Sequence, residues 1–94
     1  MKYFVYELHV RTQPFHAEFY GYLIYNKTQN QVGSIIVKET QREARKRCNE
    51  ILDIASQYDN SIVVWRNWPI VISREDDEET ILNTIKEREI QWGT

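Results

Sequence analysis

Residues 39–58, ETQREARKRCNEILDIASQY, decide the fold, because they carry the clearest helix pattern in the chain. Small and apolar side chains recur there at intervals of three or four residues, which places them on one side of a helix. These side chains are Ala44, Cys48, Ile51, Ala55 and Tyr58. Thr40 followed by Glu43 matches a capping box, in which each side chain satisfies a backbone N–H group of the first turn. The run contains neither Gly nor Pro, so the stretch predicts an uninterrupted helix.

Three strands are predicted before this helix. Residues 2–11, KYFVYELHVR, alternate with a period of two, as in a strand with one face on the core. Residues 17–26 and 31–38 are rich in aromatic and β-branched side chains, which favour strands. Two faces are expected in 17–26: one with Phe19, Leu23 and Tyr25, and one with Tyr20, Tyr22 and Ile24. Gly21 and Gly33 mark positions for β-bulges or close backbone approaches.

Two further extended runs follow the helix. Residues 61–66 predict a fourth strand. Residues 70–72 predict a fifth short strand or a connecting arm, because Pro69 lacks the N–H donor that a central strand needs.

A second helix is predicted at the C-terminal end. Ser73 with Asp76, or the acidic run of residues 75–79 itself, supplies its start. Its apolar stripe comprises Ile81, Leu82, Ile85 and Trp92. The chain is therefore predicted to be one α+β domain of residues 1–94, with an antiparallel sheet of four to five strands and two helices in the order β-β-β-α-β-(β)-α.

Composition limits the class of protein. The 94 residues carry a net charge of −2 and are 41% hydrophobic, which suits one modest globular core. Cys48 is the only cysteine and lies on the apolar side of its helix, so we interpret it as a small core side chain. The absence of a disulfide framework, of a signal-peptide pattern and of a long apolar run predicts a soluble, cytoplasmic protein with no membrane contact.

Charged clusters suggest two kinds of partner. Arg42, Arg45 and Lys46 lie close together on the first helix, where they predict either a nucleic-acid-binding patch or an ordinary solvated face. The acidic run of residues 75–79 suits a solvated helix start, a surface for a basic partner or, less well, a divalent ion.

The two histidines give the enzymatic alternative. His9 and His16 are expected on neighbouring strands with Glu7 and Glu18, a set that resembles a small metal-binding or acid–base site. Their spacing matches no zinc motif, and the sequence contains no glycine-rich phosphate loop. We therefore predict no catalytic residue, no metal ligand and no cofactor.

The excess of aromatic residues, 13% of the chain, points to a partner protein. If both helices pack on one side of the sheet, the other side exposes tyrosines, whereas one helix on each side would cover them. The segment 65–69, WRNWP, adds Trp and Arg, which anchor many interfaces. The predicted partner-binding residues are Tyr3, Tyr20, Tyr22, Trp65 and Trp68. The sequence thus favours a non-enzymatic protein–protein interaction or regulatory domain, with a homodimer through the tyrosine-rich sheet face as its specific form.

Overall fold

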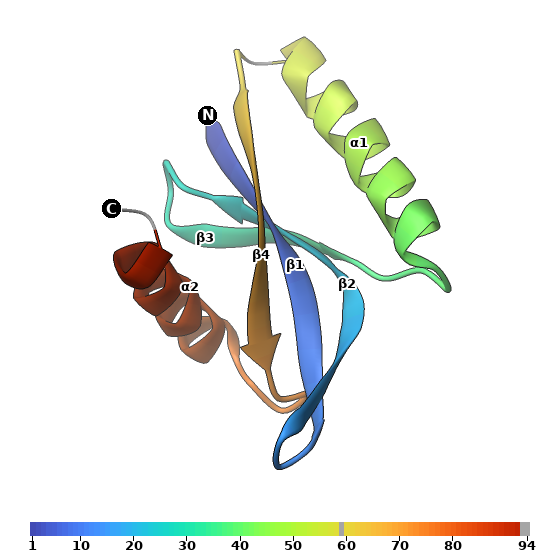
Figure 1. The fold of residues 1–94 in the computed structure, drawn as a ribbon. Coiled ribbons are helices and arrows are strands. Elements are labelled where there is room, and N and C mark those ends of the chain that lie inside the picture. Colours follow the sequence, from blue (N-terminus) through green and yellow to red (C-terminus); the bar gives the residue numbers. More distant parts are fainter. Residues whose placement is uncertain (59, 93–94) are drawn as a thin grey trace.

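Six elements follow one another in the order β-β-β-α-β-α (Figure 1). The computed structural model describes residues 1–58 and 60–92. The elements are β1 (Lys2–Gln13), β2 (His16–Asn26), β3 (Gln31–Ile36), α1 (Gln41–Tyr58), β4 (Ile62–Ile72) and α2 (Glu78–Trp92). The predicted α+β class with two helices is confirmed. The predicted runs 61–66 and 70–72 form one strand, β4, which begins at Ile62.

The four strands form one mixed sheet in the order β3-β2-β1-β4. The β1–β2 and β2–β3 pairs are antiparallel, as the meander predicts. β4 instead pairs parallel to β1, so the prediction of a purely antiparallel sheet is wrong. The cause is the connection through α1: a helix that follows a strand carries the chain back to the end where that strand began. The next strand then runs in the same direction.

One helix covers each face of the sheet, so the sheet is the middle of three layers (Figure 1). α1 packs on the first face through Ala44, Cys48 and Leu52. α2 packs on the other face through Ile81 and Ile85. The strand residues under α1 are Val5, Tyr22, Ile24 and Ile36. The strand residues under α2 are Phe4, Tyr6, Leu8, Val10, Leu23, Tyr25, Ile70 and Ile72.

A β-bulge in β2 changes which side chains share a face. Leu8 pairs with Gly21 and His9 pairs with Phe19, which leaves Tyr20 as the extra residue. One extra residue moves all side chains beyond it to the opposite face. Phe19 therefore lies with Tyr22 on the α1 side, at a ring-centroid distance of 5.5 Å, and the prediction that it shares a face with Leu23 and Tyr25 is wrong.

A larger bulge interrupts β4. Val5 pairs with Trp65 and Glu7 pairs with Pro69, so Tyr6 faces three residues, 66–68, of the partner strand. Two extra residues restore the alternation, and the even-numbered side chains of β4 stay on the α2 face before and after the bulge. Asn67 takes the left-handed backbone conformation, with φ of 58°, which asparagine tolerates better than most residues.

Both helices start with a side-chain cap. The Glu43 N–H donates to Thr40 Oγ over 3.2 Å, which is the Thr40 half of the predicted capping box. At α2 the Thr80 N–H donates to Asp77 Oδ1 over 2.9 Å, so the acidic run supplies the cap. Among the described residues, neither helix combines the length and apolar character needed to cross a membrane.

Candidate functional site

The two edges of the sheet, β3 and β4, differ in how far they are protected from pairing with a strand of another molecule. β3 has only 6 residues, and the backbone N–H of Val32 donates to Glu78 Oε1 of α2 over 3.1 Å. A short strand whose donor is satisfied by a side chain gives little template for another strand. The β3 edge is therefore a poor docking surface.

The β4 edge is open over residues 62–65. β4 has 11 residues, but the bulge at 66–68 and Pro69, which has no N–H donor, interrupt its edge beyond Trp65. The Ile62 N–H donates to Met1 O over 2.9 Å, so the backbone groups of Ile62 and Val64 face β1 and those of Val63 and Trp65 face outward. Within residues 1–58 and 60–92, no side chain hydrogen-bonds to the backbone of β4. The segment 62–65 is uncharged and leaves Ile62 60% exposed.

A tryptophan–arginine stack flanks this edge on the α1 side. The Arg45 guanidinium of α1 lies 4.6 Å from the ring centroid of Trp65. The other side of Trp65 meets Tyr22 edge-on, with ring centroids 5.9 Å apart. Trp65 thus contacts both a buried ring and an exposed cation.

A second stack lies on the α2 side, at the bulge. The Arg66 guanidinium lies between two rings, 4.4 Å from the centroid of Phe4 and 4.8 Å from that of Trp68. Glu89 of α2 accepts hydrogen bonds from Arg66 and also from the Tyr6 hydroxyl. This network fixes Trp68 against α2.

The last turn of α2 extends that stack. Trp92 meets Trp68 edge-on with ring centroids 5.6 Å apart, and the Arg88 guanidinium lies 4.9 Å from the Trp92 centroid. We call the outer edge of β4, with Arg45 and Trp65 on the α1 side and Trp68, Arg88 and Trp92 on the α2 side, the tryptophan edge. It gathers the two residue types that most often dominate binding energy at interfaces.

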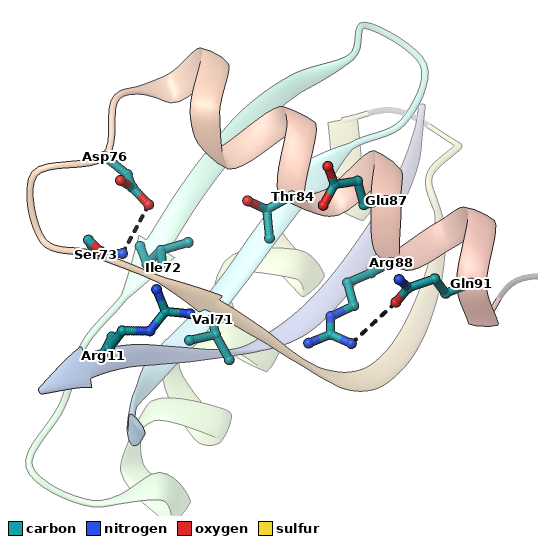
Figure 2. Close-up of a pocket in the computed structure, with 9 residues that line it drawn as sticks. All are labelled: Arg11, Val71, Ile72, Ser73, Asp76, Thr84, Glu87, Arg88 and Gln91. Carbon is teal, nitrogen blue, oxygen red and sulfur yellow. Dashed lines mark hydrogen bonds between the residues drawn. The ribbon is translucent and has the colours of Figure 1, made fainter. Parts of the chain in front are cut away.

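A polar pocket of about 420 Å³ lies between α2 and the C-terminal end of β4 (Figure 2). Helix residues spaced by three and four, namely Thr84, Glu87, Arg88 and Gln91, form one wall. The strand side consists of Arg11, Val71, Ile72 and Ser73, with Asp76 from the following loop. In the view of Figure 2, the Arg11 and Arg88 side chains lie on either side of Val71.

The predicted tyrosines are placed differently from one another. Tyr22 is 1% exposed and packs beneath α1, and Tyr3 is partly buried against the same cluster. Tyr20 is 37% exposed at the β2 bulge, where the Arg74 guanidinium lies 5.9 Å from its ring centroid. The structure does not bring these three tyrosines together on one open face, whereas it does bring Trp65 and Trp68 to one edge.

The basic residues of the alternative prediction do come together. Arg42, Arg45 and Lys46 line one shallow depression on the outer side of α1. Glu50 and Asp53 line the same depression, which lowers its positive potential.

The two histidines are far apart along the hairpin. His9 pairs with Phe19, whereas His16 pairs with Gln13 near the turn. Each histidine lies 3.4 Å from a glutamate of its own strand, His9 from Glu7 and His16 from Glu18. Among the described residues, no group of three or more His, Cys, Asp or Glu side chains is arranged to hold a metal ion.

Sequence reasoning missed most of the α2 side of the tryptophan edge. Trp92 was assigned to the apolar stripe of α2, and Arg88 was not singled out. The spacing of Arg88 and Trp92, one helical turn apart, was the available signal for their stack. Nothing in the sequence indicates that α2 ends beside Trp68.

Comparison of the chain with protein-family models, with curated proteins and with solved structures finds no match to any of them.

Proposed function

We propose that this chain is a non-enzymatic protein–protein interaction domain that binds an extended segment of a partner along the outer edge of β4. The observation that supports this most strongly is the contrast between the edges. Glu78 of α2 accepts a hydrogen bond from the Val32 N–H of β3, whereas the outward backbone groups of Val63 and Trp65 in β4 have no side-chain partner among the described residues.

The mode of binding would be addition of a strand. In this mode, backbone hydrogen bonds supply much of the affinity, and the side chains on either side of the strand supply specificity. The stacked pairs of the tryptophan edge stand on both sides of the β4 backbone. An added strand would therefore meet rigid aromatic surface on each of its faces.

Self-association is a specific form of the same proposal. α1 and α2 occupy the two faces of the sheet, so we place a homodimer contact at the β4 edge rather than at the tyrosine-rich face. Two β4 strands paired antiparallel about a two-fold axis would join the two sheets into one. Light scattering distinguishes this form, because a partner segment from another protein leaves the chain a monomer.

The test is to select binders from random peptides of 11 residues, the length of β4, displayed on phage. Selected peptides are expected to shift the NMR signals of Val63 and Trp65 and to slow the exchange of their amide protons. Val63→Pro removes one outward N–H group and is expected to weaken binding by about tenfold. Binders that shift other surfaces and leave β4 unchanged would overturn the proposal.

A matched substitution checks the assumed register. Val64 directs its backbone toward β1, so Val64→Pro should remove a ladder hydrogen bond and destabilise the fold by about 3 kcal/mol or more. Val63→Pro should leave the free energy of unfolding within about 1 kcal/mol of that of the wild type. Urea unfolding measures both.

Nucleic-acid binding is the second candidate, because Arg42, Arg45 and Lys46 share one depression. Contacts with phosphates would weaken steeply as salt is added. A gel-shift assay at low salt with single- and double-stranded DNA and RNA tests it, and no retention of any of them would exclude it.

We also propose a reducing, cytoplasmic location. Cys48 is a free thiol on the sheet-facing side of α1, where it is fully buried, and the chain has no second cysteine to pair with it.

A further inference from the structure

We infer that the segment that pairs with β4 is acidic and places one carboxylate on each side of the sheet, one on Arg45 and one on Arg88. This inference rests on the proposed function and names the chemistry of the partner. It is carried by two arginines, Arg45 and Arg88, that flank the β4 edge and form no ion pair with a described carboxylate.

On the α1 side, the unpartnered cation is Arg45. Its guanidinium lies over the Trp65 ring, and none of the described carboxylates comes within ion-pair distance of it. The nearby Glu50 instead pairs with Arg47 over 3.1 Å. A stacked guanidinium keeps its N–H groups free at the rim, in a planar arrangement that matches a carboxylate.

On the α2 side, the unpartnered cation is Arg88. It stacks on Trp92 and donates to Gln91 Oε1 over 3.4 Å, and it forms no ion pair with a described residue. Arg88 lines the polar pocket beside Ile72, and Arg11 of β1 lies across Val71 from it (Figure 2). The planar guanidinium of an arginine provides parallel donors for both oxygens of a carboxylate.

The acidic residues at this pocket do not fill that role. Asp76 Oδ2 accepts the backbone N–H of Ser73 over 2.9 Å, which holds Asp76 in its turn. Glu87 is exposed on α2 and forms no ion pair with a described residue. These two carboxylates lower the positive potential of the pocket, but neither forms an ion pair with Arg88.

Arg66 provides the internal comparison. It is also stacked between rings at the same edge, but Glu89 holds it through two hydrogen bonds. A stacked arginine of this edge therefore does accept a carboxylate when the chain supplies one. Arg45 and Arg88 also stack on tryptophan rings, but the described part of the chain supplies no carboxylate to them, so we assign that carboxylate to the partner.

The geometry of a strand adds a spacing rule. Successive side chains of an added strand point to opposite faces of the sheet. Arg45 lies on the α1 side and Arg88 on the α2 side. The two acidic residues of the partner must therefore be separated by an odd number of positions. Trp65 and Ile72 lie opposite Val5 and Val10 of β1, so the matching spacing is i, i+5.

The experiment applies the random-peptide selection to three proteins. These are the wild type, the double variant Arg45→Gln/Arg88→Gln, and the control variant Lys27→Gln/Lys86→Gln. The control removes the same charge from the groove on the other side of α2, where Lys27 and Lys86 lie. Peptides selected on the wild type and on the control are expected to be rich in Asp and Glu pairs at odd spacing.

The double variant is expected to select peptides without that enrichment, and to bind the acidic peptides about tenfold more weakly than the wild type. Wild-type peptides that bind β4 with no acidic preference, or with acids at even spacing only, would overturn this inference and leave the proposed function standing. A selection that yields no β4 binder from any protein would overturn both.

Discussion

Arg66 and Glu89 join the bulge of β4 to α2 through two hydrogen bonds, from Arg66 Nε to Glu89 Oε1 over 3.1 Å and from Arg66 Nη2 to Glu89 Oε2 over 3.2 Å. The side chains are 27% and 18% exposed, so solvent screens this pair only partly. The Tyr6 hydroxyl donates to the same carboxylate. The pair therefore connects β1, β4 and α2 at one point and sets the position of Trp68.

Removing the Arg66–Glu89 pair should destabilise the fold. Arg66→Ala is expected to lower the free energy of unfolding by about 2–3 kcal/mol, because it breaks a charge-assisted double hydrogen bond and leaves Glu89 half-buried without its cation. Arg66→Lys should recover only part of the loss, since an ammonium cannot form the planar double contact. Urea unfolding measures each change.

The control for that substitution is Arg47→Ala. Arg47 pairs with Glu50 over 3.1 Å, but both side chains are 49% exposed. Its loss should change the free energy of unfolding by less than about 1 kcal/mol. Equal effects of Arg66→Ala and Arg47→Ala would show that the Arg66–Glu89 pair contributes no more than a surface ion pair.

Tyr6 should make the fold sensitive to alkali. Burial raises the pKa of Tyr6, and the hydrogen bond to the Glu89 carboxylate raises it further. Because the pKa is higher in the folded than in the unfolded chain, the stability that Tyr6 contributes is complete below pH about 10 and decreases as the pH rises beyond it. Tyr25, whose pKa is also raised by burial and by Glu89, acts in the same direction.

Tyr6→Phe tests this pH dependence. The variant is expected to lose about 1 kcal/mol at neutral pH, because Glu89 loses a donor. Its stability should then fall less steeply than that of the wild type between about pH 10 and pH 12. Parallel curves of unfolding free energy against pH would contradict the assignment.

Cys48 should be chemically silent in the folded protein. Burial raises the pKa of its thiol to about 11, against an opposing effect of Arg45, so almost no thiolate forms at neutral pH. A disulfide reagent at pH 8 is expected to modify Cys48 only as fast as the chain opens, and in one rapid phase after denaturation in urea. Rapid modification of the native protein would place the thiol outside the core.

Gly21 lies where a side chain has no room. A Cβ atom added there would lie 2.0 Å from the backbone oxygen of Ile36, on the neighbouring strand. Gly21→Ala is therefore expected to force the β2 and β3 backbones apart and to cost about 1–3 kcal/mol. Gly33→Ala is the milder comparison, because its Cβ would lie 3.2 Å from the Ile24 oxygen. Thermal unfolding of both variants is expected to show a larger decrease in Tm for Gly21→Ala than for Gly33→Ala.

Local patterns in the sequence were sufficient to predict individual helices, caps and bulge sites. The spacing of Ala44 and Cys48 predicted α1, and Thr40 predicted its cap, since periodicity and capping depend only on residues a few positions apart. Gly33 was predicted as a site for a bulge, and it is the unpaired residue between Val32 and Ser34 in the β2–β3 ladder.

The tertiary structure decided how these elements combine. The bulge at Tyr20 moved Phe19 to the other face, because one extra residue inverts every side chain beyond it and no local pattern shows where the extra residue falls. The parallel pairing of β4 with β1, and the meeting of Trp68 with Trp92, depend on contacts between segments far apart in the chain. The sequence by itself therefore determined both helices, the three strands before α1 and the cap of α1. The three-layer packing alone decided that the tyrosines are partly covered while the tryptophans and arginines gather along one open strand.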